Sequence, residues 1–294
     1  MPSFLTEAAF GLRRGRHLIH YVGDTNSGLS ASVPTVVTVH GVASRWITTA
    51  RNPLQERIWR WRVARAIESA SAVVTVSESS RADISEVFGV DPDQIHVIPH
   101  GLDHMVLEST EESRLPDLPA SFALYLGNIE PRKNIVELVR AFDLPEMKGT
   151  GVPLVVAGRP AWNYEESMQA IEESANVIYV GAVSDSDRER LMRRAQVFVF
   201  PSLYEGFGFP ILEAMRLGTP VVTSKNGSLR DLSGPSKVVS DSSAEAIAAT
   251  LSDALSDTGW LEASRVSGPD WASQFSWRDS ASAHAAVYES VMRR

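Results

Sequence analysis

Two glutamates that are separated by seven residues flank a glycine-rich turn in the second half of the chain. The segment Tyr204-Glu-Gly-Phe-Gly-Phe-Pro210 follows the apolar run 197–200, and Glu213 comes about one helical turn later. Glycine lets a backbone approach a ligand closely, and Pro210 suits the first position of a helix. Backbone N–H groups at a helix start attract phosphate and hydroxyl oxygens, while ionised carboxylates accept hydrogen bonds from vicinal hydroxyls. Glu205 and Glu213 can therefore hold different parts of one extended ligand that carries phosphate and sugar hydroxyls.

Short apolar runs alternate with helical segments along the chain. This alternation predicts an α/β fold with mostly parallel, doubly wound sheets. A charged and then proline-containing segment, 108–119, is the predicted linker, which places a hinge near residue 110. The predicted strands are 18–21, 35–40, 72–76, 95–98, 123–127, 154–157, 177–180, 197–200 and 220–223.

Cationic and imidazole side chains stand at the ends of several predicted strands. Arg132 and Lys133 follow strand 123–127 at its carboxyl end, where ligands of open α/β sheets bind. His40 ends strand 35–40 and either faces a ligand or is an ordinary turn residue. His100 precedes a glycine and is expected to shape a crossover loop. Ser77 is predicted to cap the next helix, and its hydroxyl can also face a ligand.

Four segments together resemble the retaining glycosyltransferases of family 4, which have two facing Rossmann-like domains in the GT-B fold. They are the glutamate pair with its glycine turn and the segments 126–134, 74–81 and 97–103. The motifs occur in the family's order, and the resemblance covers roughly residues 18–294. It implies a reduced first domain on the acceptor side over 1–110, a nucleotide-sugar domain over 111–275, and a terminal helix over 276–294 that crosses back to the first domain.

The resemblance assigns a role to each residue of the glycine turn. Glu213 is expected to hold the donor's ribose hydroxyls, and Glu205 the hydroxyls of the transferred sugar. The backbone N–H groups of Gly206, Phe207 and Gly208 are expected to face the sugar and the distal phosphate.

The resemblance also assigns the residues around the leaving group. The departing nucleoside diphosphate develops negative charge, so the site needs fixed positive charge. Arg132 and Lys133 are expected to clamp the diphosphate beside the loop that begins at Gly127. His40 is expected to approach the donor sugar from the first domain, and domain closure to assemble the site.

The reaction implied by the resemblance is front-face transfer with retention to a hydroxyl acceptor. It requires no cofactor and no metal, because cationic side chains and a helix start neutralise the phosphates. The triplets Asp91-Pro-Asp93 and Asp185-Ser-Asp187 are interpreted as a turn and a helix cap rather than as metal ligands. The loop 127–133 and Phe209 favour a mannose-like sugar on GDP or dTDP over one on UDP. Backbone near Gly158 and 179–183 is expected to recognise the base.

Composition agrees with a soluble enzyme. The chain has no cysteine, so disulfides and thiolate chemistry are excluded. No apolar run reaches the roughly 18 residues that span a bilayer, and the N-terminus lacks an apolar signal core. We therefore expect a cytoplasmic protein, with contact at the inner membrane face as an open alternative.

Positive charge gathers at the front of the chain. Residues 1–70 contain nine Lys or Arg against four Asp or Glu, although the net charge of the whole chain is −8. Much of this charge falls in a predicted helix over 53–69 with Asn52 as its cap. Its arginines and tryptophans suit an anionic membrane or an acidic acceptor. The alternative is an ordinary helix that buries Leu54, Ile58 and Trp61 against the sheet.

Two other functions remain open at this point. The predicted first domain has only four strands, with residues 1–15 in place of the family's glycine-rich loop. The chain can thus be a donor-binding subunit that needs a partner chain or a second copy to complete this domain. A nucleic-acid-modifying transferase is the third reading, which the acidic bulk of the chain disfavours. The expected acceptor of the enzyme is a glycan or a lipid-linked glycan.

Overall fold

The computed structural model describes residues 17–26, 33–48, 51–103 and 115–293, and its described part divides into two compact units. Unit 1 contains the chain up to Gly101 and returns from Phe275 onward, while unit 2 runs from Leu102 to Gln274. Most of the predicted linker 108–119, and the front segment 1–15, lie outside the described residues.

Unit 1 is built on a parallel sheet whose four described strands follow one another in the order β1-β2-β3-β4. Each strand pairs only with its neighbour in the sequence, for example Val37 with Val73 between β2 and β3. The strands are β1 (Ile19–Tyr21), β2 (Thr35–Thr38), β3 (Ala72–Thr75) and β4 (Ile95–Val97). The helical segments are η1 (Ala43–Arg45), α2 (Pro53–Ser69), α3 (Glu78–Phe88), η2 (Pro92–Gln94) and α12 (Trp277–Met292).

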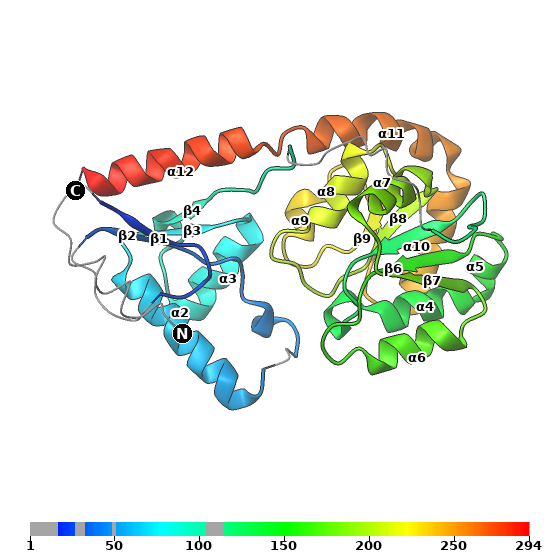
Figure 1. The fold of residues 1–294 in the computed structure, drawn as a ribbon, viewed down its shortest axis with the longest axis horizontal. Coiled ribbons are helices and arrows are strands. Elements are labelled where there is room, and N and C mark those ends of the chain that lie inside the picture. Colours follow the sequence, from blue (N-terminus) through cyan, green and yellow to red (C-terminus); the bar gives the residue numbers. More distant parts are fainter. Residues whose placement is uncertain (1–16, 27–32, 49–50, 104–114, 294) are drawn as a thin grey trace. The chain divides into compact units, whose positions relative to one another are not determined.

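Helices cover both faces of this first sheet, because alternate valines of a strand point to opposite faces. Val37 packs with Val63 of α2 and Ile84 of α3 in one buried cluster. Val36 packs instead with Val287 of α12 in a second cluster. Figure 1 shows α12 on one side of β1–β4, with α2 and α3 on the other. The C-terminal helix is thus part of the core of unit 1.

Helix α2 begins where the sequence predicts, but it is turned differently. Asn52 accepts a hydrogen bond from the Gln55 backbone, and the Gln55 side chain accepts one from the Asn52 backbone, which completes a capping box. The buried residues of α2 are Val63 and Ala66. The predicted burial of Leu54, Ile58 and Trp61 is wrong, since these side chains are 64%, 49% and 63% exposed. The side of α2 that packs in the core is instead the one with Val63 and Ala66, next to which Trp59 and Ile67 are partly buried.

Unit 2 is built on a second parallel sheet, with described strands in the order β10-β9-β8-β5-β6-β7. Its strands are β5 (Ala123–Leu126), β6 (Leu154–Ala157), β7 (Val177–Gly181), β8 (Val197–Phe200), β9 (Val221–Thr223) and β10 (Lys237–Val238). The nine predicted strands are confirmed; β10, with two residues, was not predicted. Its helical segments are η3 (Pro131–Lys133), α4 (Ile135–Asp143), α5 (Pro145–Lys148), α6 (Glu165–Glu173), α7 (Asp185–Arg194), α8 (Phe209–Arg216), α9 (Leu229–Leu232), α10 (Ala244–Ser256) and α11 (Thr258–Ala272).

Candidate functional site

The order of the second sheet places a crevice beside β5 and β8. These strands are neighbours, and the chain proceeds outward from them in opposite directions through β6 and β9. Loops at the carboxyl ends of strands separate at such a switch point, where open α/β sheets bind ligands. Helix η3 follows β5, and Glu205 follows β8. The fold therefore brings Arg132 and Lys133 next to Glu205 from distant parts of the chain.

A buried carboxylate joins the two predicted diphosphate ligands. Arg132 Nη1 donates to Glu205 Oε2 at 2.6 Å, and Lys133 Nζ donates to Glu205 Oε1 at 2.6 Å. The Lys133 ammonium also lies 4.7 Å from the centre of the Phe200 ring. The Lys133 side chain is 7% exposed and that of Glu205 is 9% exposed. Glu205 thus holds both cations in place from the middle of the cluster.

A fourth charged residue, Glu130, belongs to the same cluster. Arg132 Nε donates to Glu130 Oε1 at 2.9 Å, and Arg132 Nη1 donates to the carbonyl of Tyr204 at 2.8 Å. Glu130 is buried, whereas the Arg132 side chain is 22% exposed. Sequence reasoning did not assign Glu130 a role, although its place two residues before Arg132 is a signal. Glu130 fixes the plane of the Arg132 guanidinium, and with it the cluster contains two cations and two carboxylates.

Glu205 and Arg132 each favour the charged form of the other, whereas burial lowers the pKa of Lys133 despite the nearby carboxylates. Burial alone would raise the pKa of Glu205, but the charges and hydrogen bonds of Lys133 and Arg132 lower it below its ordinary value. For Arg132, burial is likewise outweighed by Glu205 and Glu130, and its pKa is raised. Glu205 is therefore ionised at neutral pH in a place that would otherwise exclude a charge.

The glycine turn after β8 is fixed by a hydroxyl from another loop. Ser228 Oγ contacts the carbonyl of Glu205 at 3.0 Å and that of Phe207 at 2.5 Å, and the Ser228 side chain is fully buried. Gly208 caps α8 with a φ of 99°, and a Cβ there would lie 2.9 Å from Leu229. Pro210 is the second residue of α8 rather than the predicted first. Ser228 was missed because nothing in its local sequence marks it.

Glu213 lies in the second turn of α8 and is almost fully buried. Arg188 Nη2 of α7 donates to Glu213 Oε1 at 3.2 Å. Asp185 and Asp187 lie in the first turn of the same α7, whose N-cap is Ser184. Arg188 is a second contact that sequence reasoning missed, because α7 and α8 meet only in the folded unit. It orients the carboxylate on the start of α8.

Close backbone contact surrounds Gly127 at the end of β5. Its N–H donates to the carbonyl of Ala157 at 3.0 Å. A Cβ on Gly158, whose φ is 151°, would lie 1.8 Å from the Gly127 carbonyl oxygen. The Tyr179 hydroxyl donates to the carbonyl of Gly158 at 2.9 Å. The positions that we expected to face the base therefore adjoin the Gly127 loop, with no room for a side chain on Gly158.

His40 belongs to unit 1 and lies in the loop after β2. Its backbone N–H donates to Asp24 Oδ1 at 2.8 Å, and its Nε2 lies 2.8 Å from the carbonyl oxygen of Val22. The His40 and His100 rings stack with centroids 5.6 Å apart. Burial, and after it the neighbouring histidines, lowers the pKa of His100 to about 4. His100 is thus neutral at pH 7, and its ring stacks on that of His40 within this unit.

A second histidine group, which sequence reasoning missed, connects β1 with α12. His20 Nδ1 lies 2.7 Å from the Tyr288 hydroxyl, and His20 Nε2 lies 2.7 Å from Thr38 Oγ1. The His20 and His284 rings are 5.6 Å apart. Burial, followed by His284 and His40, lowers the pKa of His20 to about 4.

Elsewhere in unit 1, Ser77 is confirmed as the N-cap of α3, because its side chain accepts a hydrogen bond from the Ser80 backbone.

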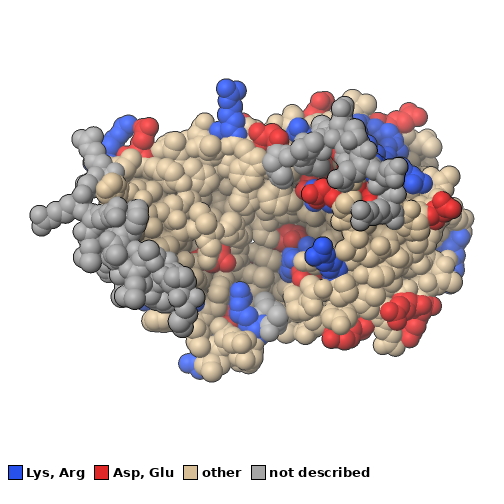
Figure 2. Space-filling view, viewed as in Figure 1, with Lys and Arg blue, Asp and Glu red and all other residues tan. Residues whose placement is uncertain are grey.

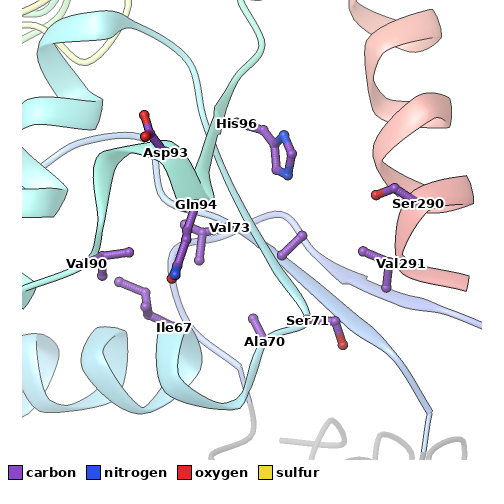
Figure 3. Close-up of a pocket in the computed structure, with 11 residues that line it drawn as sticks. Ile67, Ala70, Ser71, Val73, Val90, Asp93, Gln94, His96, Ser290 and Val291 are labelled. Atoms are coloured by element: carbon purple, nitrogen blue, oxygen red, sulfur yellow. The ribbon is translucent and has the colours of Figure 1, made fainter. Parts of the chain in front are cut away.

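A hollow of about 390 Å³ lies elsewhere in unit 1. Figure 3 shows its lining from η2, β4, the start of β3 and the end of α12. The residues are Ile67, Ala70, Ser71, Ala72, Val73, Val90, Asp93, Gln94, His96, Ser290 and Val291. Because Ala72 begins β3 whereas His40 follows the carboxyl end of β2, this hollow is at the opposite edge of the sheet from His40.

The described residues contain neither a metal-binding cluster nor a helix that could cross a membrane. Within the described ranges, no group of three or more His, Asp or Glu side chains has an arrangement that can hold a metal ion. Among the helices of this same part of the chain, none combines the length and apolarity needed to cross a membrane.

Family models match both units. The model described as "Glycosyl transferases group 1" matches residues 108–267, more than half of the chain. The model described as "Glycosyltransferase Family 4" matches residues 2–105, which begins before the residue 18 at which we expected the resemblance to start. Together the two matches span both sheets.

Similar proteins include two bacterial mannosyltransferases. The chain is 35% identical over 225 residues to O-antigen chain mannosyltransferase B of Escherichia coli, covering 73% of this chain and 59% of that protein. It is 31% identical over 282 residues to the MMP alpha-(1->4)-mannosyltransferase of Mycolicibacterium hassiacum, covering 89% of this chain and 66% of that protein. The chain thus spans less than two thirds of the length of these relatives.

Solved structures with the GT-B fold match nearly the whole chain. Sucrose-phosphate synthase from Thermosynechococcus elongatus superposes with a TM-score of 0.77 at 22% identity, over 99% of this chain and 77% of that chain. Anabaena HepE in complex with UDP and glucose superposes with a TM-score of 0.70 at 21% identity, over 90% of this chain and 73% of that chain. At such identities the match establishes the architecture, which confirms the predicted pair of Rossmann-like α/β units.

Proposed function

Because the chain belongs to the glycosyl transferases group 1 family, we propose that it is a retaining glycosyltransferase that moves a sugar from a nucleoside-diphosphate sugar to a hydroxyl of an acceptor. The observation that carries the proposal is the cluster of Arg132, Lys133 and Glu205 beside the glycine turn that starts α8. The mannosyltransferases among the similar proteins favour mannose as the sugar. We propose GDP or dTDP before UDP as the carrier, and a glycan or a lipid-linked glycan as the acceptor.

Arg132 and Lys133 stabilise the charge that develops on the leaving diphosphate. An ammonium group has three N–H donors, and Lys133 gives one of them to Glu205. Arg132 is the more exposed of the two cations and meets the phosphate oxygens from the open side. Their placement before the donor arrives means that little reorganisation is needed in the transition state.

The carboxylates and the helix start hold the rest of the donor. Glu213 accepts the ribose hydroxyls while Arg188 keeps its orientation. The backbone N–H groups of Gly206, Phe207 and Gly208 face the sugar and the distal phosphate. Each Glu205 oxygen has a second lone pair, with which it accepts from a hydroxyl of the transferred sugar while it holds the cations.

The reaction needs no side-chain nucleophile in this proposal. The departing phosphate oxygen takes the proton of the acceptor hydroxyl as that hydroxyl attacks the same face of the anomeric carbon. His40, from unit 1, is proposed to contact the donor sugar. Metal independence is part of the proposal, since Arg132 and Lys133 supply the positive charge that a divalent ion would supply.

The test is calorimetric binding of the purified chain to GDP-, dTDP- and UDP-sugars, with and without EDTA, followed by measurement of slow donor hydrolysis. We expect Lys133→Ala and Glu213→Ala each to weaken donor binding by roughly tenfold or more, because each removes a charged contact. Lys148→Ala, at an exposed lysine of α5, is the matched control and is expected to have no effect.

Three outcomes would change the proposal. Unchanged donor affinity in both variants would refute the site. Loss of binding on addition of EDTA would refute metal independence. Donor binding without hydrolysis or transfer would favour the alternative in which a partner chain completes the activity.

A further inference from the structure

Helix α2 leaves an apolar stripe on its exposed face. Leu54, Ile58 and Trp61 follow one another at spacings of four and three residues, which places them along one side of a helix. Their side chains are 64%, 49% and 63% exposed, although the opposite side of α2 buries Val63 and Ala66 against the sheet. An ordinary surface helix shows the reverse pattern, with its large apolar side chains turned inward. We therefore expect a partner outside unit 1 to cover this apolar stripe.

Arginines border this stripe on both sides. At 100° per residue, Arg57 and Arg62 fall on opposite flanks of the line through Leu54, Ile58 and Trp61. Both arginines are exposed, and neither makes an ion pair with any residue that the structure describes. Figure 2 shows blue atoms beside tan ones at the lower edge of the view, where α2 reaches the surface. The face is thus positive in a chain whose net charge is −8.

An open hollow of about 430 Å³ adjoins the same face. Arg62 and Ile58 line it together with Arg51 and Trp59. The Arg51 guanidinium lies 4.4 Å from the centre of the Trp59 ring at the rim of the hollow and pairs with Glu56 at 3.2 Å, so Arg62 supplies the uncompensated charge there. Two guanidinium groups beside a concave surface suit one phosphate group.

We propose that this α2 face binds the surface of a bilayer that contains anionic phospholipid. The apolar stripe enters the boundary between headgroups and acyl chains, where tryptophan is favoured, and Arg57 and Arg62 contact lipid phosphates on either side. The hollow between Arg51 and Arg62 takes one headgroup phosphate. A second copy of the chain fits less well, because a two-fold contact through this face would bring the arginines of both copies together.

Membrane binding through α2 does not depend on the proposed reaction, but it affects how the enzyme meets its acceptor. An enzyme held at an anionic membrane surface meets lipid-carried acceptors at high local concentration. The binding surface is formed entirely within unit 1, by α2 and the loops beside it. Donor binding, which we assign to unit 2, can therefore be measured separately.

The experiment is co-sedimentation of the full chain with vesicles of phosphatidylcholine alone or mixed with phosphatidylglycerol. We expect binding only to the mixed vesicles, and weaker binding as salt is raised. Ile58→Ser with Trp61→Ser, and separately Arg57→Glu with Arg62→Glu, should each weaken it by roughly tenfold or more. Arg265→Glu with Val266→Ser, which changes the same residue types on the exposed surface of α11, is the matched control and should bind as the unaltered chain does.

Equal binding to both kinds of vesicle, or to neither, would overturn the inference. So would an equal loss of binding in the α11 control. Concentration-dependent dimers in sedimentation, removed by the α2 substitutions, would assign the face to a second copy instead. Calorimetric donor binding by the same α2 variants should be unchanged, so absence of donor binding alongside vesicle binding would refute the proposed function and leave this inference standing.

Discussion

The buried polar groups of unit 1 and unit 2 differ in whether they carry charge at neutral pH. In unit 2, Arg132 and Lys133 lie against Glu205, and the opposite charges keep the carboxylate ionised. In unit 1, the neighbours that act on the pKa of His20 and His100 are other histidines, and burial lowers both values to about 4. One cluster is thus built from charges and the other from groups that stay neutral at pH 7.

This difference in charge indicates which kind of ligand or neighbouring group each cluster can contact. Fixed charges in a dry crevice attract a charged ligand and cost little to reorganise, which suits a diphosphate. Neutral imidazoles donate and accept hydrogen bonds without a net charge, which suits hydroxyls and the packing of α12. The following substitutions and conditions act on one cluster and not on the other.

The largest expected effect comes from removal of the central carboxylate of the charged cluster. Glu205→Ala leaves buried Lys133 without its counter-charge, so we expect the free energy of unfolding to fall by about 3–5 kcal/mol. Urea unfolding followed by circular dichroism measures this change. Glu262→Ala, at an exposed glutamate of α11, is the control. A loss for Glu205→Ala no larger than that for Glu262→Ala would show that the charges are not coupled.

The second largest effect is acid sensitivity of the histidine cluster. An unfolded histidine binds a proton below about pH 6.5, whereas folded His20 and His100 do so only near pH 4. Their contribution to stability is therefore present above pH 6.5 and is lost as the pH falls toward 4. Allowing for partial exposure, we expect a loss of about 1 kcal/mol for each histidine between pH 7 and pH 5.

Unfolding in urea at these two pH values measures the acid loss. His20→Gln with His100→Gln should flatten the dependence, because glutamine does not titrate there. His96→Gln, at an exposed histidine, should leave it unchanged. If the free energy of unfolding changed equally with pH in the double variant and in the unaltered chain, His20 and His100 would not be the source of the acid sensitivity.

A third and smaller effect tests the glycine turn that completes the charged cluster. Ser228→Ala leaves the buried carbonyls of Glu205 and Phe207 without this hydroxyl, so we expect a loss of about 1–2 kcal/mol. Donor affinity should fall with it, since we propose that the turn presents its N–H groups to the donor. Ser267→Ala, on the exposed surface of α11, is the control for both readouts. Lower stability with unchanged donor affinity would separate the turn from the donor site.

The sequence predicted the sheets and the charged cluster because their signals are local. Nine strands are apolar runs with turn residues at their ends, and each was found. Arg132, Lys133 and Glu205 stand at strand ends, and parallel strands bring their carboxyl ends to one edge. Their roles in donor binding stay predictions.

The contacts between distant segments could not be predicted in the same way. The pairing of Arg188 with Glu213, and of Ser228 with the glycine turn, depends on how loops pack after the sheet has formed. The rotation of α2 was predicted wrongly because its apolar residues occur on two sides of the helix. Hydrophobic periodicity shows which sides of a helix are apolar, but it does not show which of these sides packs on a short sheet.

Substitution of His40 is expected to change donor affinity least and tests whether unit 1 takes part in donor binding. His40→Ala should leave the calorimetric affinity for a nucleotide sugar within about twofold, because the donor contacts that we propose for its phosphates and ribose all lie in unit 2. Transfer should nevertheless fall by roughly tenfold or more if the imidazole contacts the reacting sugar. His96→Ala is the matched control in the same sheet and should change neither quantity. If His40→Ala weakened donor binding as much as Lys133→Ala does, the His40 imidazole would share in ground-state binding, and the assignment of donor binding to the charged cluster of unit 2 alone would fail.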